Sequence, residues 1–146
     1  MYERILFATD GRDHATAVAE HAIDIARTRD AELRILSVVD DRAFLVLDDE
    51  RVQAVRNDLR ENALAAVDDA SHVAAEHGVE AETIVDTGNP ADCVLTYAAE
   101  HDVDLIVMGT SGDSYETNVV GSVSQRVVRE SPVPVLTVGP AASDNR

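Results

Sequence analysis

The sequence predicts an α/β fold, with a doubly wound, five-stranded parallel sheet and helices on both of its faces. Short apolar runs rich in Val, Ile and Leu alternate with longer stretches whose apolar residues recur every three or four positions. The runs are typical of buried strands and the stretches of amphipathic helices, and the resulting order is βαβαβαβαβ. Such alternation builds parallel sheets through right-handed crossovers. For 146 residues with one cysteine, we expect a single domain at 1–140 and a flexible C-terminal tail at 141–146.

The first half of the chain is predicted to supply two strands and two helices. Buried strands are expected at RILFATDG and AELRILSVVD. Between them, DHATAVAEHAIDIARTRD carries an apolar stripe at helical spacing, with Asp13 as the expected N-cap. A connection at DRAFLVLDD leads to a long helix that begins near Glu50 and stops at His77-Gly78, because glycine suits the left-handed residue after a helix.

The second half is predicted to supply three strands and two shorter helices. A third strand at VEAETIVDTG is followed by Asn89-Pro90, an N-cap and a first-turn proline that begin the next helix. The run VDLIVMG is almost wholly apolar, which favours a central strand with neighbours on both sides. A short helix at SVSQRVVRES ends at Pro132, and PVPVLTVG forms the last strand.

The strand order predicts where a ligand would bind. In doubly wound sheets of order 3-2-1-4-5 the first strand is central, and ligands lie beyond the carboxyl ends of the strands where the winding reverses. Here that point falls between the first and fourth strands, so the segments ATDGRD and GTSGDSYETNVVGS are expected to meet there.

These two segments carry groups suited to a ribose with phosphates. Gly109 and Gly112 allow close approach of the backbone, and Gly121-Ser122 begins a helix whose free N–H groups favour an anion. Asp10 offers an acceptor for a pair of ribose hydroxyls or for the water shell of a metal. The same glycines also suit a plain connection and the same serine a plain cap, so the residues alone leave both interpretations open.

The charge excludes several classes of protein. Asp and Glu number 28 against 12 basic residues, all of them arginine, and the formal net charge is −16. Such a chain repels nucleic acid and acidic membranes, and without lysine it cannot be a P-loop NTPase. The composition resembles that of salt-accumulating halophilic archaea. No stretch approaches the ~18 apolar residues of a membrane span, so we expect a cytoplasmic protein.

Other enzyme and cofactor classes receive little support. Phospho-receiver domains share the fold but also use a lysine, and FMN binding is disfavoured by an aromatic content of 3%. No histidine lies near Ser122 in sequence, and the five histidines lack metal-ligand spacing, so no catalytic or metal residue is assigned. We expect Cys93 to be a small buried residue and Arg126 to form a helix-surface salt bridge.

Taken together, GTSG, VVGSVSQRVVRESPVPVLTV and RILFATDG resemble the universal stress protein family, over essentially the whole chain. Its nucleotide-binding branch carries G-x2-G-x9-G-[S/T] between the fourth strand and the last helix. The resemblance implies a Rossmann-like, adenine nucleotide alpha hydrolase-like fold that binds ATP, AMP or ADP, with Mg²⁺ as a candidate companion. The residues that it implies for this site are Ala8, Thr9, Asp10, Val38, Met108, Gly109, Gly112, Gly121, Ser122 and Val123.

Within that set the resemblance implies separate roles. Asp10 would hold the ribose, the backbone of Val38 would meet the adenine, and residues 121–123 would lie near the phosphates. Two features depart from the family pattern. Only eight residues separate Gly112 from Gly121, and Asp113 stands where relatives often have a basic residue. A ligand with fewer phosphates, or reliance on Mg²⁺, would follow from a shortened acidic loop.

The resemblance implies a stress-response regulator and not a fast enzyme, with slow ATP hydrolysis left open. An alternative is a dimeric scaffold that regulates partners without nucleotide. The segment Pro132–Val138 favours a homodimer in either case, because its prolines suit an edge strand and its valines would leave an apolar edge exposed. In the family this strand pairs across a two-fold axis.

Overall fold

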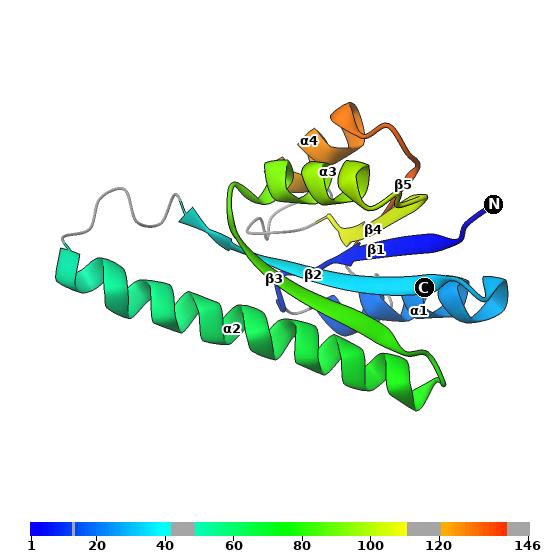
Figure 1. Cartoon of the computed structure of the whole chain (residues 1–146), viewed down its shortest axis with the longest axis horizontal. Coiled ribbons are helices and arrows are strands. Elements are labelled where there is room, and N and C mark those ends of the chain that lie inside the picture. Colours follow the sequence, from blue (N-terminus) through cyan, green and yellow to red (C-terminus); the bar gives the residue numbers. More distant parts are fainter. Residues whose placement is uncertain (13, 42–48, 111–120, 140–146) are drawn as a thin grey trace, which may run out of the picture.

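The computed structural model describes residues 1–12, 14–41, 49–110 and 121–139, so the predicted tail lies outside the described residues (Figure 1). Its five strands pair in parallel in the order β3-β2-β1-β4-β5, which confirms the predicted fold class and strand order. The strands are β1 (Arg4–Ala8), β2 (Glu32–Asp40), β3 (Ala81–Gly88), β4 (Leu105–Gly109) and β5 (Val135–Val138). The helices are α1 (Ala15–Arg29), α2 (Asp49–Glu76), α3 (Pro90–Glu100) and α4 (Ser122–Glu130).

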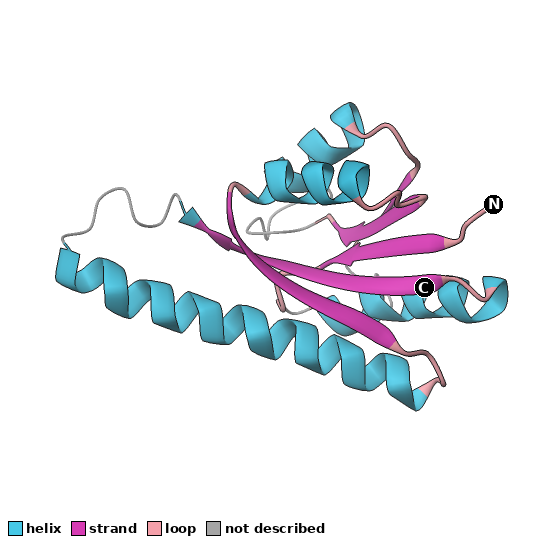
Figure 2. Cartoon of the chain, in the orientation of Figure 1, coloured by secondary structure: helices cyan, strands magenta, loops and turns pink. Residues whose placement is uncertain are grey.

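Alternating side chains of the strands build two separate cores. Ile5 and Phe7 of β1 pack with the buried faces of α1 and α2, whereas Leu6 packs with α3 and α4. Figure 2 shows the corresponding three layers, with the sheet between two pairs of helices. Because side chains of a strand point alternately to opposite faces, a central strand must be apolar at every position. The first four residues of β4 are all buried, as the run VDLIVMG predicted.

The ends of the helices follow the predicted signals with one exception. Asn89 caps α3, since its Oδ1 accepts a hydrogen bond from the Asp92 N–H at 3.2 Å. Gly78 follows α2 with φ of +78°. The expectation that Asp13 caps α1 was wrong. The helix begins at Ala15, and His14 occupies the N-cap position without a side-chain hydrogen bond, while Asp13 lies outside the described residues. None of the described helices is long and apolar enough to cross a membrane.

The β1–α1 loop packs closely against α2. Gly11 has φ of +74°, and a Cβ added there would lie 2.8 Å from the Cβ of Ala66. Carbon atoms cannot approach so closely, so only glycine lets the loop lie this near the middle of α2. This contact fixes the backbone that follows β1.

Gly11→Ala is therefore expected to destabilise the protein more than Gly78→Ala. Both glycines have a positive φ, but a Cβ at Gly78 would meet nothing within 4 Å. The Gly78 variant carries only the cost of a left-handed alanine, about 1–2 kcal/mol, while Gly11→Ala adds overpacking for a total of about 2–4 kcal/mol. Urea denaturation of both variants measures the difference, and equal losses would show that the contact with Ala66 adds nothing.

Candidate functional site

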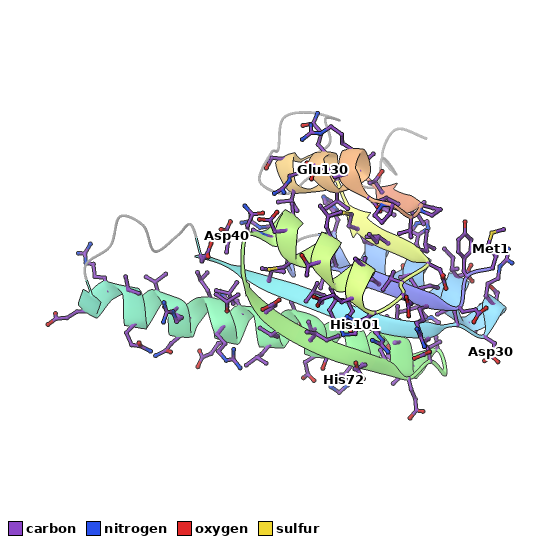
Figure 3. All side chains as sticks on the ribbon, turned by 45° about the horizontal axis from the view of Figure 1, so that its top comes forward. Met1, Asp30, Asp40, His72, His101 and Glu130 are labelled. Atoms are coloured by element: carbon purple, nitrogen blue, oxygen red, sulfur yellow. The ribbon has the colours of Figure 1, made fainter. Side chains whose placement is uncertain are left out.

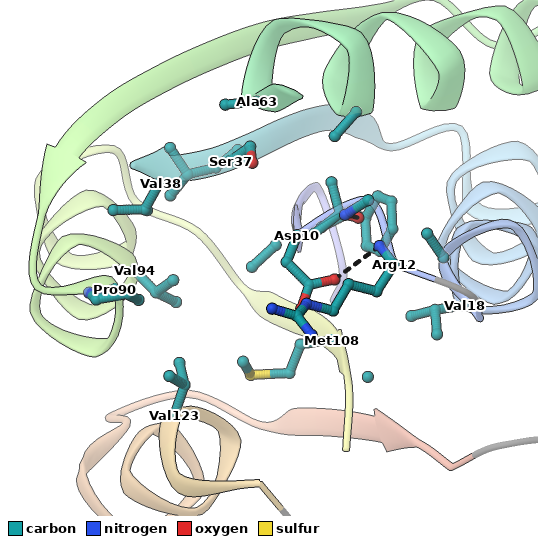
Figure 4. A pocket seen from close by; sticks show the side chains of 18 of the residues that line it. Asp10, Arg12, Val18, Ser37, Val38, Ala63, Pro90, Val94, Met108 and Val123 are labelled. Atoms are coloured by element: carbon teal, nitrogen blue, oxygen red, sulfur yellow. Dashed lines mark hydrogen bonds and ion pairs between the residues drawn. The ribbon is translucent and has the colours of Figure 1, made fainter. Parts of the chain in front are cut away.

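A cavity of about 770 Å³ opens at the carboxyl ends of β1, β2 and β4 (Figure 4). Its walls come from the β1–α1 loop, the middle of α2, and the N-terminal turns of α3 and α4. The cavity lies at the reversal of winding between β1 and β4, where the strand order predicted a ligand site. Its volume falls within the range of small-molecule sites.

Nine of the ten residues implied by the resemblance line this one cavity. Gly112 lies outside the described residues, as does the shortened segment 113–120. The nine come from β1 and its loop, from β2, from β4 and from the start of α4. They are Ala8, Thr9, Asp10, Val38, Met108, Gly109, Gly121, Ser122 and Val123.

The β1–α1 loop is held in place by its own polar groups. The Thr9 N–H donates to the Leu36 carbonyl at 2.9 Å, which continues the pairing of β1 with β2. Thr9 Oγ1 accepts a hydrogen bond from the Gly11 N–H, and Asp10 Oδ1 accepts one from the Arg12 N–H at 3.0 Å. The second carboxylate oxygen of Asp10 lies 3.4 Å from Nε of Arg12. Asp10 is thus presented at the cavity with one oxygen bonded to the loop and the other beside a guanidinium.

The start of α4 presents backbone donors to the same cavity. Gly121 is the N-cap, with φ of −62° and ψ of 160°, and as a glycine it has no side chain of its own to cap the helix. The Gly121 N–H donates to the Thr110 carbonyl, which ties the helix to the end of β4. The first N–H groups of a helix have no partner within it, and the helix dipole is positive at this end. Ser122 and Val123 therefore bring hydrogen-bond donors and partial positive charge to a wall of the cavity.

Part of the site was missed at the sequence level. The face of α2 that covers the cavity includes Leu59, Asn62 and Ala63, and α3 adds Pro90 and Val94. The apolar spacing in α2 predicted that the helix has a buried face, but spacing cannot say which strand ends that face covers. The wall formed by α3 could have been predicted from the helix start at Asn89-Pro90, because this helix also begins at the carboxyl ends of the strands.

Arg126 joins the two helices on one side of the cavity. Its guanidinium donates to the Asp92 carboxylate, to Asn89 Oδ1 at 3.3 Å and to Glu130 Oε2 at 3.2 Å. The hydrogen bond to Asp92 is the main cause that raises the pKa of Arg126, with the Glu130 bond second. The predicted salt bridge is therefore confirmed, and it bridges α4 to the start of α3. Both of these helix starts line the cavity.

Cys93 is only half-buried, so the expectation of a small buried residue was wrong. The residue faces the end of β3, because a Cβ added at Gly88 would lie 3.0 Å from its sulfur. Burial, followed by the neighbouring Asp86 carboxylate, raises the pKa of Cys93 to about 11. A thiol with this pKa stays protonated near neutral pH, and a protonated thiol is a poor nucleophile. Among the described residues, no cluster of His, Cys, Asp and Glu could hold a metal ion.

These features define a doubly wound α/β protein with a cavity at the reversal of its winding. Residues 1–139 match the universal stress protein family, and the chain belongs to that family. A universal stress protein of Methanocaldococcus jannaschii is 36% identical over 140 residues, covering 94% of this chain and 82% of the relative.

Solved structures of the family share the fold. The universal stress protein UspA from Lactobacillus plantarum has a TM-score of 0.77 at 30% identity, covering 94% of this chain and 97% of the other. A universal stress protein solved in complex with cAMP has a TM-score of 0.71 at 26% identity, covering 96% of this chain and 98% of the other.

Proposed function

We propose that this universal stress protein binds an adenine nucleotide in the cavity between β1 and β4 and acts as a nucleotide-responsive regulator. The observation that carries the proposal is the convergence of two complementary groups on one cavity. The start of α4 suits a phosphate, and the Asp10 carboxylate suits ribose hydroxyls. The related protein solved with cAMP supports the same class of ligand.

The walls of the cavity fit the three parts of such a ligand. Ser122 and Val123 offer backbone N–H groups to a phosphate at the positive end of α4. Asp10 follows β1, the strand beside β4, and its carboxylate is a hydrogen-bond acceptor for the ribose hydroxyls. Pro90 and Val94 supply apolar surface beside Val38. Val38 is the residue whose backbone, by the family resemblance, would contact the adenine.

Substitution of Ser122 tests this assignment without weakening the fold. Ser122 is exposed at the first position of α4, where an acidic side chain favours the helix dipole. Ser122→Asp should therefore retain the melting temperature of the free protein but lose the stabilisation by AMP, because the new carboxylate repels the phosphate. Ser122→Asn, which has the same shape without the charge, is the control and should keep most of the stabilisation.

Thermal melts with and without AMP at about 0.15 M salt provide the measurement, because molar salt would screen the repulsion between the introduced carboxylate and the phosphate. A ligand at about 100 times its Kd stabilises the folded state by about 2.7 kcal/mol, which is easily detected in the wild-type protein. The assignment fails if Ser122→Asp is stabilised as much as Ser122→Asn. A wild-type protein that no adenine nucleotide stabilises would favour the scaffold function instead.

We propose that the protein is a homodimer that pairs through β5. Among the described strands β5 has only β4 as a neighbour, and it forms an edge of the sheet. Ile106 of β4 and Thr110, which directly follows β4, donate to the carbonyls of Pro134 and Val138. By alternation, the backbone groups of Val135 and Thr137 point outward and are available to a second copy.

Thr137→Pro should make the protein monomeric while leaving the fold intact. Proline removes an N–H that points away from β4, a position where edge strands tolerate it. Light scattering at micromolar concentration measures the mass, and circular dichroism checks the fold. A wild-type protein that is monomeric under these conditions contradicts the dimer, and a dimeric Thr137→Pro variant contradicts the pairing through β5.

A further inference from the structure

Helix α4 is short, and few of its side chains are buried. It is nine residues long, and its buried residues are Ser124 and Val127. A helix of this length is unstable on its own in water, so its position depends on the elements that it packs against. Figure 3 shows α4, which ends at Glu130, beside α3. The contacts between these two helices therefore help to fix the place of the start of α4.

Arg126 of α4 makes polar contacts with the first turn of α3. Its guanidinium donates to the Asp92 carboxylate and to Asn89 Oδ1 at 3.3 Å. The same oxygen of Asn89 accepts the Asp92 N–H and so caps α3. Within α4 the guanidinium also donates to Glu130 Oε2 at 3.2 Å. Arg126 is thus held from its own helix and binds the capped first turn of the neighbouring one.

The two helix starts that Arg126 joins form different parts of the cavity wall. Pro90 and Val94 of α3 provide apolar surface, whereas Ser122 and Val123 of α4 provide backbone N–H donors. Arg126 is not among the described residues that line the cavity. It therefore acts on a ligand through the placement of these two walls or through its charge, and the two effects can be separated.

We infer that Arg126 is a positioning residue for the nucleotide, because it holds the donors that face the phosphate at a fixed distance from the apolar wall that faces the adenine. This role rests on the proposed function, since it needs a nucleotide in the cavity. A mononucleotide joins its base to its phosphate, so it must fit both walls at once. Where the walls are already held at that spacing, binding does not have to order them, and the affinity is higher.

Loss of this bridge should weaken binding of the whole nucleotide more than binding of either of its parts. Adenosine does not need the donors of α4, and inorganic phosphate does not need the wall of α3. Arg126→Met removes the guanidinium but keeps a long apolar side chain that suits a helix. It should lower the affinity for AMP about tenfold, and the affinities for adenosine and inorganic phosphate less than about twofold.

A second variant separates the bridge from the effect of charge. Arg126→Met removes a positive charge, whereas Asp92→Ala breaks the same bridge by removing a negative one. Charge alone predicts weaker binding of AMP by the first variant and tighter binding by the second. The bridge predicts weaker binding by both. Arg126→Lys keeps the charge without the planar fork and should recover part of the affinity that Arg126→Met loses.

Titration of the ¹⁵N-labelled protein with AMP, adenosine and inorganic phosphate, followed by amide chemical shifts, measures the three affinities. Arg129→Met is the matched control, because it removes the same charge from an exposed side chain whose ion pair with Glu130, at 3.6 Å, stays within α4. Its affinities should equal those of the wild-type protein. Circular dichroism checks that each variant is folded, and Asp92→Ala decides the outcome if Arg126→Met does not fold.

The positioning role of Arg126 is overturned if Asp92→Ala binds AMP as tightly as the wild-type protein or more tightly. It is also overturned if Arg126→Met loses as much affinity for adenosine or inorganic phosphate as for AMP. A wild-type protein that binds neither AMP nor adenosine contradicts the proposed function, and the positioning role is then overturned with it. AMP binding that is unchanged in both variants contradicts the positioning role alone.

Discussion

Two crossovers that leave the sheet on opposite faces determine the rest of this structure. The chain leaves β1 through α1 on one face and leaves β4 through α4 on the other, although β1 and β4 are hydrogen-bonded neighbours. Because crossovers between parallel strands are right-handed, the change of direction after β3 forces this divergence. The connections after β1 and β4 must separate, and the cavity opens between them.

Close packing then holds each wall of that cavity on its own face of the sheet. On one face, Gly11 lets the β1–α1 loop contact Ala66 of α2, and Gly109 lies where an added Cβ would be 3.4 Å from Val18. On the other face, Arg126 ties α4 to Asp92 of α3. The donors of α4 and the carboxylate of Asp10 are thus positioned by different sets of contacts. Their relative placement depends on the β1–β4 pairing that joins the two faces.

The parts predicted from the sequence are those that depend on local pattern. Buried strands, amphipathic helices and the Asn89-Pro90 helix start are each encoded in a few neighbouring residues, and their order defines the sheet. The wall formed by α2 depends on tertiary contacts instead. The spacing in a helix of 28 residues shows which face is buried, but not that its middle lies over the carboxyl edge of the sheet. The flanking apolar residues of Cys93 likewise gave no indication that its sulfur faces Asp86 at the end of β3.

The central claim is that a phosphate-bearing ligand binds where β1 and β4 diverge. Titration of the ¹⁵N-labelled protein with AMP, followed by amide chemical shifts, tests it residue by residue. We predict the largest shifts at Asp10, Ser122 and Val123. We predict none at Glu32 and Asp104, which lie at the amino ends of the strands, opposite the cavity. Shifts confined to the amino ends of the strands, or saturable binding that leaves the Ser122 and Val123 amides unshifted, would contradict the account.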